Sequence, residues 1–310
     1  MNDAATKKGD RRFPALLRHA VKDATATEYS RALAQFLRWA SEQGCTARTV
    51  PDLDYLLAEY FSVLCFDQRV AGSRAALTFS GVKHFLPEIG KGLPAAARAL
   101  KAYKKIFVGR EGEGFGEEVW GILLSRLYAR DQEAALILAL SVDAYLRGAE
   151  WAALRPEDVH FAATSAALSL GVVERGEETK TGSNQGVVVD RPWVARWLRD
   201  FARRRKKGKF FFSMSRDDYH ALFDDAARDL RASGLPLTPH SARHAGATID
   251  ALVNGKSMPD IQRRGRWLAP ASVARYAKPH VLVRQNARLS KQMLQKGREF
   301  LDKIKYRQDR

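Results

Sequence analysis

Apolar residues recur at helical spacing through the first hundred residues of the chain. Around residues 29–37 and 53–64, apolar side chains lie three or four positions apart, which is typical of amphipathic helices. Thr25 and Glu28 have the spacing of a capping box, so we expect one helix to begin there, and Pro51 is expected to open a second. Further helical patterns begin near Ser73 and after Pro94. These patterns predict an all-helical domain over residues 1–108.

The pattern is interrupted by glycines at positions 109, 112, 114 and 116, with acidic residues between them, and we predict a linker over residues 109–116. Helical periodicity returns over residues 117–128 and 131–146. Residues 168–173 and 186–189 are β-rich runs separated by a polar segment, which indicates a hairpin with a long tip. From residue 191 onward we expect helices again, around a short apolar piece at 210–212, with a last helix after Val283.

The predicted fold class is therefore mainly α (α+β). A mostly helical domain over residues 117–310, containing a small antiparallel β-hairpin or sheet and ending in a helix, follows the first domain and the linker. The length of 310 residues suits two domains, and 45% hydrophobic with 28% charged residues is the composition of a globular protein rather than a disordered one.

The chain shows no membrane or export signal. Its longest apolar stretch, residues 134–142, is too short to span a bilayer, and residues 1–13 lack the apolar segment of a secretory signal. Cys45 and Cys65 suggest neither a metal site nor a disulfide framework. We expect an intracellular protein, in the nucleus of a eukaryote or the cytoplasm of a bacterium.

Positive charge is in large excess and is unevenly distributed. The net charge is +17, and residues 191–216 hold ten Lys and Arg against one acid, while residues 255–291 hold nine against one. Such an excess indicates a polyanionic partner, nucleic acid or, less well, an anionic membrane surface. We predict that both segments face a phosphodiester backbone and that binding weakens with salt. The residues singled out for DNA contact are Arg203, Arg204, Arg205, Lys206, Lys207, Arg263, Arg264 and Arg266.

Several common phosphate-handling motifs are absent from the sequence. It contains no Gly-rich phosphate loop, no metal-type spacing of Cys and His, and no cluster of acids typical of a two-metal nuclease. If the protein cuts nucleic acid, we therefore expect a side-chain nucleophile, cationic groups on the phosphate and a proton donor, with no metal or other cofactor.

The C-terminal half offers such a set in a defined order. Glu150 follows the first arginine by three positions, and His244 directly follows a His-x-x-Arg motif. The lysine lies near the predicted hairpin tip, and the tryptophan precedes the tyrosine by nine positions. In chain order the six residues are Arg147, Lys180, His240, Arg243, Trp267 and Tyr276.

This series resembles the active site of the tyrosine recombinase/integrase family, over about residues 117–280. The resemblance implies that Tyr276 is the nucleophile, that Lys180 protonates the leaving 5′-oxygen, and that Glu150 and His244 support the site. Two positions depart from the usual pattern: Ala242 stands where the family often has Leu, and Trp267 where it more commonly has His.

The resemblance implies site-specific breakage and rejoining of double-stranded DNA, as in recombination or integration. It implies a covalent 3′-phosphotyrosyl intermediate, without metal or ATP, and a homo-tetramer on paired DNA sites. It also implies that residues 1–108 form a core-binding-like DNA-binding domain. The final helix is expected to pack either on a neighbouring subunit or on its own domain.

Physical chemistry is consistent with these roles. Guanidinium groups at Arg147 and Arg243 can bind two phosphate oxygens at once, and their charge lowers the pKa of a nearby phenol. The indole N–H of Trp267 donates a hydrogen bond but cannot carry a proton.

Taken singly, each residue also fits a structural role, such as a helix-surface ion pair for Arg147 with Glu150. Three other functions stay open: a catalytically inactive, sequence-specific DNA-binding protein of the same fold, a type IB topoisomerase-like relaxing enzyme, and a helical RNA-binding protein.

Overall fold

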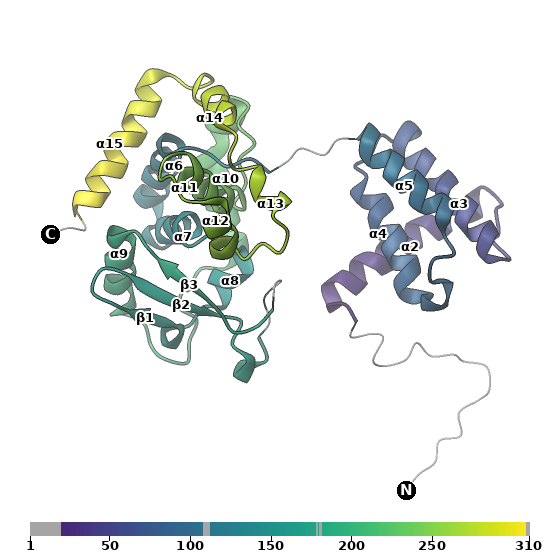
Figure 1. The fold of residues 1–310 in the computed structure, drawn as a ribbon, viewed down its shortest axis with the longest axis horizontal. Coiled ribbons are helices and arrows are strands. Elements are labelled where there is room, and N and C mark those ends of the chain that lie inside the picture. The colour runs from purple at the N-terminus through teal and green to yellow at the C-terminus, as the bar shows by residue number, and fades with distance from the viewer. Residues whose placement is uncertain (1–19, 108–111, 178, 180–181, 308–310) are drawn as a thin grey trace, which may run out of the picture. The chain divides into compact units, whose positions relative to one another are not determined.

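The computed structural model describes residues 20–107, 112–177, 179 and 182–307, which form two compact units with their boundary between Glu111 and Gly112. We refer to them as the N-terminal and the C-terminal unit (Figure 1). Helices dominate both, so the predicted mainly helical class is confirmed.

The N-terminal unit is made of helices that pack in two pairs, α2 with α4 and α3 with α5. The carboxylate of Asp54, on α3, accepts the backbone N–H groups of Ala95 and Ala96 at 2.8 Å each and so caps the start of α5. The helices are α2 (Asp23–Glu42), α3 (Val50–Ser62), α4 (Ser73–Phe85) and α5 (Pro94–Ile106), with a π-helical turn at Val63–Asp67 and a 3-10 turn at Pro87–Ile89.

The start of the first helix differs from the prediction. Helix α2 begins at Asp23, and its N-cap, Lys22, makes no side-chain capping bond, so Thr25 lies inside the first turn. The capping box of this unit is instead at α3, where the Thr49 hydroxyl accepts the N–H of Asp52 and the Asp52 carboxylate accepts the N–H of Thr49.

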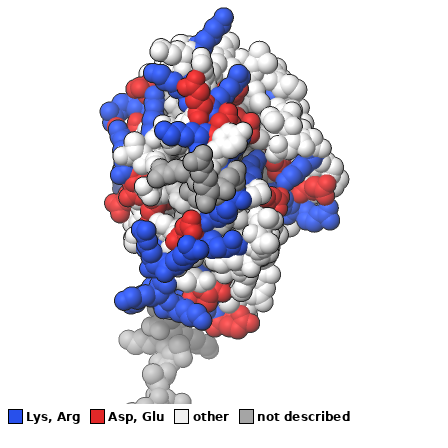
Figure 2. All heavy atoms as spheres, turned by 90° about the vertical axis from the view of Figure 1, so that its left-hand side faces the viewer, with Lys and Arg blue, Asp and Glu red and all other residues white. Residues whose placement is uncertain are grey.

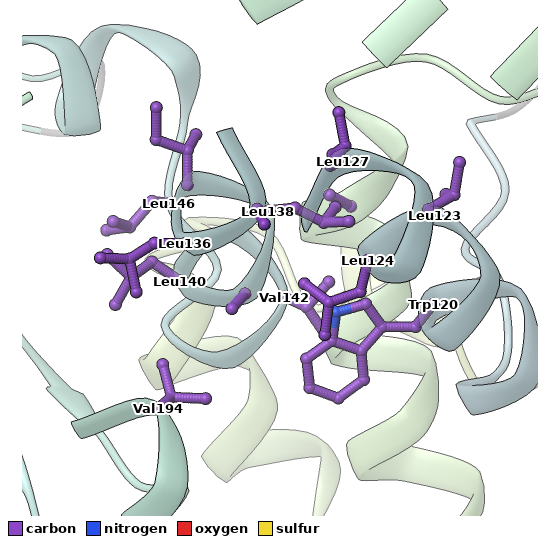
Figure 3. Close-up of a cluster of buried hydrophobic side chains, with 14 of the residues drawn as sticks. Trp120, Leu123, Leu124, Leu127, Leu136, Leu138, Leu140, Val142, Leu146 and Val194 are labelled. Carbon is purple, nitrogen blue, oxygen red and sulfur yellow. The ribbon is translucent and has the colours of Figure 1, made fainter. Parts of the chain in front are cut away.

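The C-terminal unit surrounds a buried helix, α7 (Gln132–Asp143), in which every residue from Ala134 to Asp143 is buried. A helix that is apolar on all sides is expected at the centre of a domain. Leucines of α7 meet Trp120 and Leu124 of the preceding helix and Val194 of a later one (Figure 3). The surrounding helices are α6 (Glu117–Arg130), α8 (Gly148–Ala153), α9 (Pro192–Ala202), α10 (Arg216–Ala232), α11 (Ser241–Leu252), α12 (Met258–Gly265), α13 (Ala271–Ala274), α14 (Pro279–Asn286) and α15 (Lys291–Arg307).

The strands of this unit form one antiparallel sheet in the order β1-β2-β3, as far as the described residues show. Strands β2 (Ala166–Leu170) and β3 (Gln185–Val189) are the predicted hairpin, with Leu168 opposite Val187. Strand β1 (Val159–Phe161) was not predicted, since it has three residues and two of them are exposed. Phe211 and Phe212, within the apolar piece at 210–212, are buried in a loop.

The predicted last helix is divided in two, α14 and α15. Helix α15 packs on α6 of its own unit, the second of the two positions expected for it. The two helices approach so closely that a Cβ at Gly121 would lie 1.9 Å from the carbonyl oxygen of Gly297. The Arg298 guanidinium also binds Glu118 at 2.5 Å.

The predicted linker lies partly outside the described residues. Its described end, residues 112–116, belongs to the C-terminal unit, where the Gln285 amide donates to the Gly114 carbonyl at 2.9 Å and Arg284 pairs with Glu113. No helix in the described part of the chain is long and apolar enough to cross a membrane.

Candidate active site

The first predicted catalytic residue, Arg147, lies just beyond the C-terminal end of the buried helix α7. Tyr145 has a φ of +51°, a left-handed conformation that turns the chain and leaves Arg147 as the N-cap of α8. The Glu150 carboxylate accepts both the backbone N–H of Arg147, at 2.7 Å, and its Nη1, at 2.6 Å. Arg147 is therefore held at two points by a buried acid.

Arg243 is buried in the first turn of α11, with 1% of its surface exposed. Its guanidinium donates to the backbone carbonyl oxygens of Tyr145 and Gly265, and lies 4.6 Å from the centre of the Trp267 ring. Burial, together with the charges of Arg147 and Arg266, lowers the pKa of Arg243 to about 9. The group is still positively charged at neutral pH.

Trp267 depends on the glycine at the end of α12. A Cβ at Gly265 would lie 1.8 Å from the indole ring, so only glycine lets the ring fold back over this backbone. The same arrangement exposes the Gly265 carbonyl to Arg243.

The predicted nucleophile, Tyr276, is buried, with 2% of its surface exposed. Its Oη lies 2.5 Å from Nδ1 of His244, the two rings stack at 5.3 Å, and the Trp267 ring is 5.1 Å away. Burial raises the pKa of Tyr276 to about 12, although Arg275 and Arg243 act in the opposite direction.

His244 is neutral at pH 7 in this environment. Burial lowers its pKa to about 3, with further lowering by His240 and Arg243. The His240 ring lies 4.7 Å from that of His244 and nearly perpendicular to it. A neutral imidazole can accept a hydrogen bond from the tyrosine hydroxyl at Nδ1.

The structure thus brings together every predicted catalytic residue that it describes. Arg147, His240, Arg243, Trp267 and Tyr276 surround the start of α11, and the supporting residues Glu150 and His244 bind two of them. Lys180 lies outside the described residues. Thr179 and Gly182, in the connection between β2 and β3, form an isolated antiparallel bridge.

Comparison with known proteins finds similarity in structure but not in sequence. No protein-family model and no curated protein matches the chain. The structure is similar to that of the Tn1549 transposon integrase in complex with circular intermediate DNA, at 16% identity and a TM-score of 0.58, over 88% of this chain and 96% of that one. A lambda integrase dimer bound to a COC′ core site gives 14% identity and a TM-score of 0.56, over 86% and 74% of the two chains. XerH recombinase bound to a palindromic difH substrate also gives 14% and 0.56, over 81% and 75%.

The chain has the tyrosine recombinase fold. The site residues described above lie within residues 117–280, the range over which this family was expected from the order of the motifs.

An ion-pair network that the sequence did not predict lies beneath the site. The carboxylates of Asp143 and Asp250 are fully buried, and Arg191 binds them at 2.7 and 3.4 Å. Arg264 donates to the Asp143 carbonyl at 2.6 Å, and the Tyr145 hydroxyl donates to Asp250 at 2.6 Å. The network therefore ties the end of α7, and with it the turn that carries Arg147, to α11 and α12.

The residues singled out for DNA contact divide into two groups. Arg264 and Arg266 are largely buried in ion pairs, and Arg205 is partly buried and binds Glu133 at 2.8 Å. The other five are exposed: Arg203, Arg204, Lys206, Lys207 and Arg263. On the face drawn in Figure 2, Lys and Arg side chains are interspersed with Asp and Glu.

Proposed function

We propose that this protein breaks and rejoins double-stranded DNA through a covalent 3′-phosphotyrosyl intermediate on Tyr276. The observation that carries the proposal is the environment of the Tyr276 hydroxyl. It is hydrogen-bonded to a neutral histidine, and its ring is packed against Trp267, which in turn lies against Arg243. A nucleophilic tyrosine requires a group that accepts its proton and a positive charge that stabilises the phenolate. His244 and Arg243 fit these two roles.

The reaction is a transfer of one phosphodiester bond. Tyr276 Oη attacks the scissile phosphorus and forms a P–O bond, and the P–O5′ bond breaks. The phenol proton leaves with His244 Nδ1 as its nearest acceptor, and the 5′-oxygen departs as a hydroxyl after receiving a proton. Attack of a 5′-hydroxyl on the phosphotyrosine reverses these steps and rejoins the strand, so the energy of the phosphodiester bond is retained and no ATP is consumed.

Arg147 and Arg243 are proposed to bind the non-bridging oxygens of the scissile phosphate. Their charge stabilises the negative charge that grows on these oxygens in the transition state, and also favours the ionised phenol. Lys180 is the proposed proton donor to the 5′-oxygen. His240 and Trp267 are proposed to donate hydrogen bonds to the phosphate. No metal or other cofactor has a part in the scheme.

The site must open before DNA can react. Tyr276 and Arg243 are only 2% and 1% exposed, so a phosphodiester cannot reach both side chains in this conformation. The segment of residues 266–278 carries Trp267 and Tyr276 in short turns and the four-residue helix α13, and we propose that it moves outward when DNA binds.

DNA contact is proposed for the exposed basic residues Arg203, Arg204, Lys206, Lys207 and Arg263, and for the N-terminal unit as a core-binding-like domain. We further propose that exchange takes place in a homo-tetramer on paired sites, in an intracellular compartment.

The test uses a random DNA library, because the target sequence is not known in advance. The full chain is incubated with library duplexes that each carry one nick, and the nicks together cover every position. Cleavage close to a nick releases a short fragment, so the strand cannot be rejoined and the phosphotyrosine is trapped. Protein-linked DNA is recovered under denaturing conditions and sequenced. We expect adducts at a defined sequence with the wild type and none with Tyr276→Phe.

Other outcomes separate the remaining functions. Native retention of a defined sequence without adduct would assign an inactive DNA-binding protein. Adducts on unrelated sequences, with relaxation of supercoiled plasmid by the monomer, would assign a topoisomerase-like enzyme.

A further inference from the structure

Arg266 occupies an unusual position between Gly265 and Trp267. Its backbone is left-handed, with φ +54° and ψ +42°, a conformation that non-glycine residues adopt rarely. Its side chain is nonetheless 93% buried, since 7% of it is exposed. A buried guanidinium on a strained backbone is unfavourable unless specific contacts compensate for both.

The contacts of Arg266 reach both catalytic arginines. Its Nη2 donates to Oε2 of Glu150 at 2.6 Å and to the carbonyl oxygen of Tyr145 at 3.3 Å. The other oxygen of Glu150, Oε1, accepts the Arg147 guanidinium, and Oε2 also accepts the Arg147 backbone N–H. The Tyr145 carbonyl also accepts a hydrogen bond from Arg243. Arg266 therefore shares one acceptor with each of them, although it lies 116 positions from Glu150 in the chain.

The charges of this cluster are not balanced. Three guanidinium groups, those of Arg147, Arg243 and Arg266, surround the single carboxylate of Glu150. Burial and the charges of Arg147 and Arg264 lower the pKa of Arg266, with Glu150 acting in the opposite direction. Within the described part of the chain, Nε and Nη1 of Arg266 are buried without a hydrogen-bond partner. Such a group of like charges is stabilised when an anion enters it.

Arg266 also borders an open hollow. Together with Gln185, Arg263 and Trp267 it lines a depression of about 470 Å³ between β3 and the end of α12. The cluster thus lies next to an open surface rather than in the centre of the unit.

We propose that Arg266 is a positioning residue for strand cleavage. It neutralises Glu150 and holds the Tyr145 carbonyl, so that Arg147 and Arg243 are oriented toward the scissile phosphate and the cluster keeps an excess of two positive charges. The negative charge of the phosphate, which grows in the transition state, then meets this excess. The inference rests on the proposed function, because it concerns the same site.

The first measurement is the single-turnover rate of adduct formation on a DNA site recovered from the library. The variants are Arg266→Ala, Arg266→Lys and the control Arg228→Ala, which removes the same charge from an exposed side chain on α10. We expect Arg266→Ala to lower the rate at saturating DNA about a hundred-fold, as small misplacements of reacting groups do. The Kd for DNA should change less than about two-fold, since the side chain is buried.

Arg266→Lys should recover part of the rate, because an ammonium group can still bind Glu150. The control should match the wild type. A positioning role is refuted if Arg266→Ala reacts at the wild-type rate. It is also refuted if the rates of Arg266→Ala and Arg266→Lys fall equally and both variants have a lower Tm than the control, since the loss then comes from unfolding.

A second measurement does not depend on cleavage. Orthovanadate, a tetrahedral analogue of phosphate, should raise the Tm of the wild type and of Arg228→Ala. It should raise the Tm of Arg266→Ala and Arg266→Lys less. An equal rise in Tm for all four proteins, or no rise for any of them, overturns the inference. Failure of the wild type to form any DNA adduct, with the vanadate difference intact, overturns the proposed function instead and leaves Arg266 assigned to an anion site.

Discussion

The buried neutral histidine beside Tyr276 has a consequence for stability that can be measured. His244 is 9% exposed, and its folded-state pKa is about 3, against 6.5 for an ordinary histidine. In the unfolded chain the imidazole takes up a proton below pH 6.5, whereas in the folded protein it does so only near pH 3. The unfolded state therefore binds more protons between these values, and the free energy of unfolding falls as the pH falls through this range.

The magnitude follows from the two pKa values. Each pH unit well inside the range removes about 1.4 kcal/mol, and between pH 7 and pH 5 the loss from this single group is about 2 kcal/mol. The bond that must be broken or rearranged when the ring is protonated is the one between Nδ1 and the Tyr276 hydroxyl.

The test is urea unfolding at pH 7, 6 and 5, with the wild type, His244→Asn and the exposed His280→Gln as control. Asparagine places an amide near the position of Nδ1 and does not titrate. Five of the six tryptophans, all except Trp39, belong to the C-terminal unit, so their fluorescence reports mainly on its unfolding.

We expect the wild type and His280→Gln to lose stability toward pH 5, and His244→Asn to lose about 2 kcal/mol less over the same interval. Parallel pH profiles for the wild type and His244→Asn, whatever their offset, would refute the neutral buried histidine and its role as acceptor of the tyrosine proton.

Three further outcomes are expected elsewhere in the molecule. Gly121→Ala should destabilise the C-terminal unit by about 1–3 kcal/mol in urea unfolding, because the new Cβ collides with the carbonyl of Gly297, and an unchanged midpoint would show that α15 does not dock there. Asp250→Asn should cost about 3–5 kcal/mol in the same assay, since it removes a fully buried counter-charge, and a loss below about 1 kcal/mol would contradict the network. The double change Lys206→Ala with Lys207→Ala should reduce the slope of log Kd against log salt by up to about 2, and an unchanged slope in fluorescence anisotropy would remove both lysines from the DNA contact.

The parts of the fold and site that could be predicted from the sequence are those that depend on near neighbours. Helical periodicity located the helices of the N-terminal unit and α6 and α7, and two β-rich runs located β2 and β3. The local spacings of His240 to Arg243 and of Trp267 to Tyr276 placed these residues on one helix turn and one short segment. The three-residue strand β1 and the break between α14 and α15 could not be predicted, because so few residues carry no periodic signal.

The roles of the basic residues could not be predicted for a different reason. In sequence, Arg263, Arg264 and Arg266 are equivalent members of one positive segment. In the structure, helix α12 and its left-handed end direct Arg263 to solvent, Arg264 to Asp143 and Arg266 to Glu150. Both acids are buried and lie more than a hundred positions earlier in the chain. Only tertiary contacts decide which cations bind protein acids and which remain for a phosphodiester. Net charge alone therefore indicates a class of partner, but it does not show that Arg264 and Arg266, close to the proposed nucleophile, are paired with protein acids.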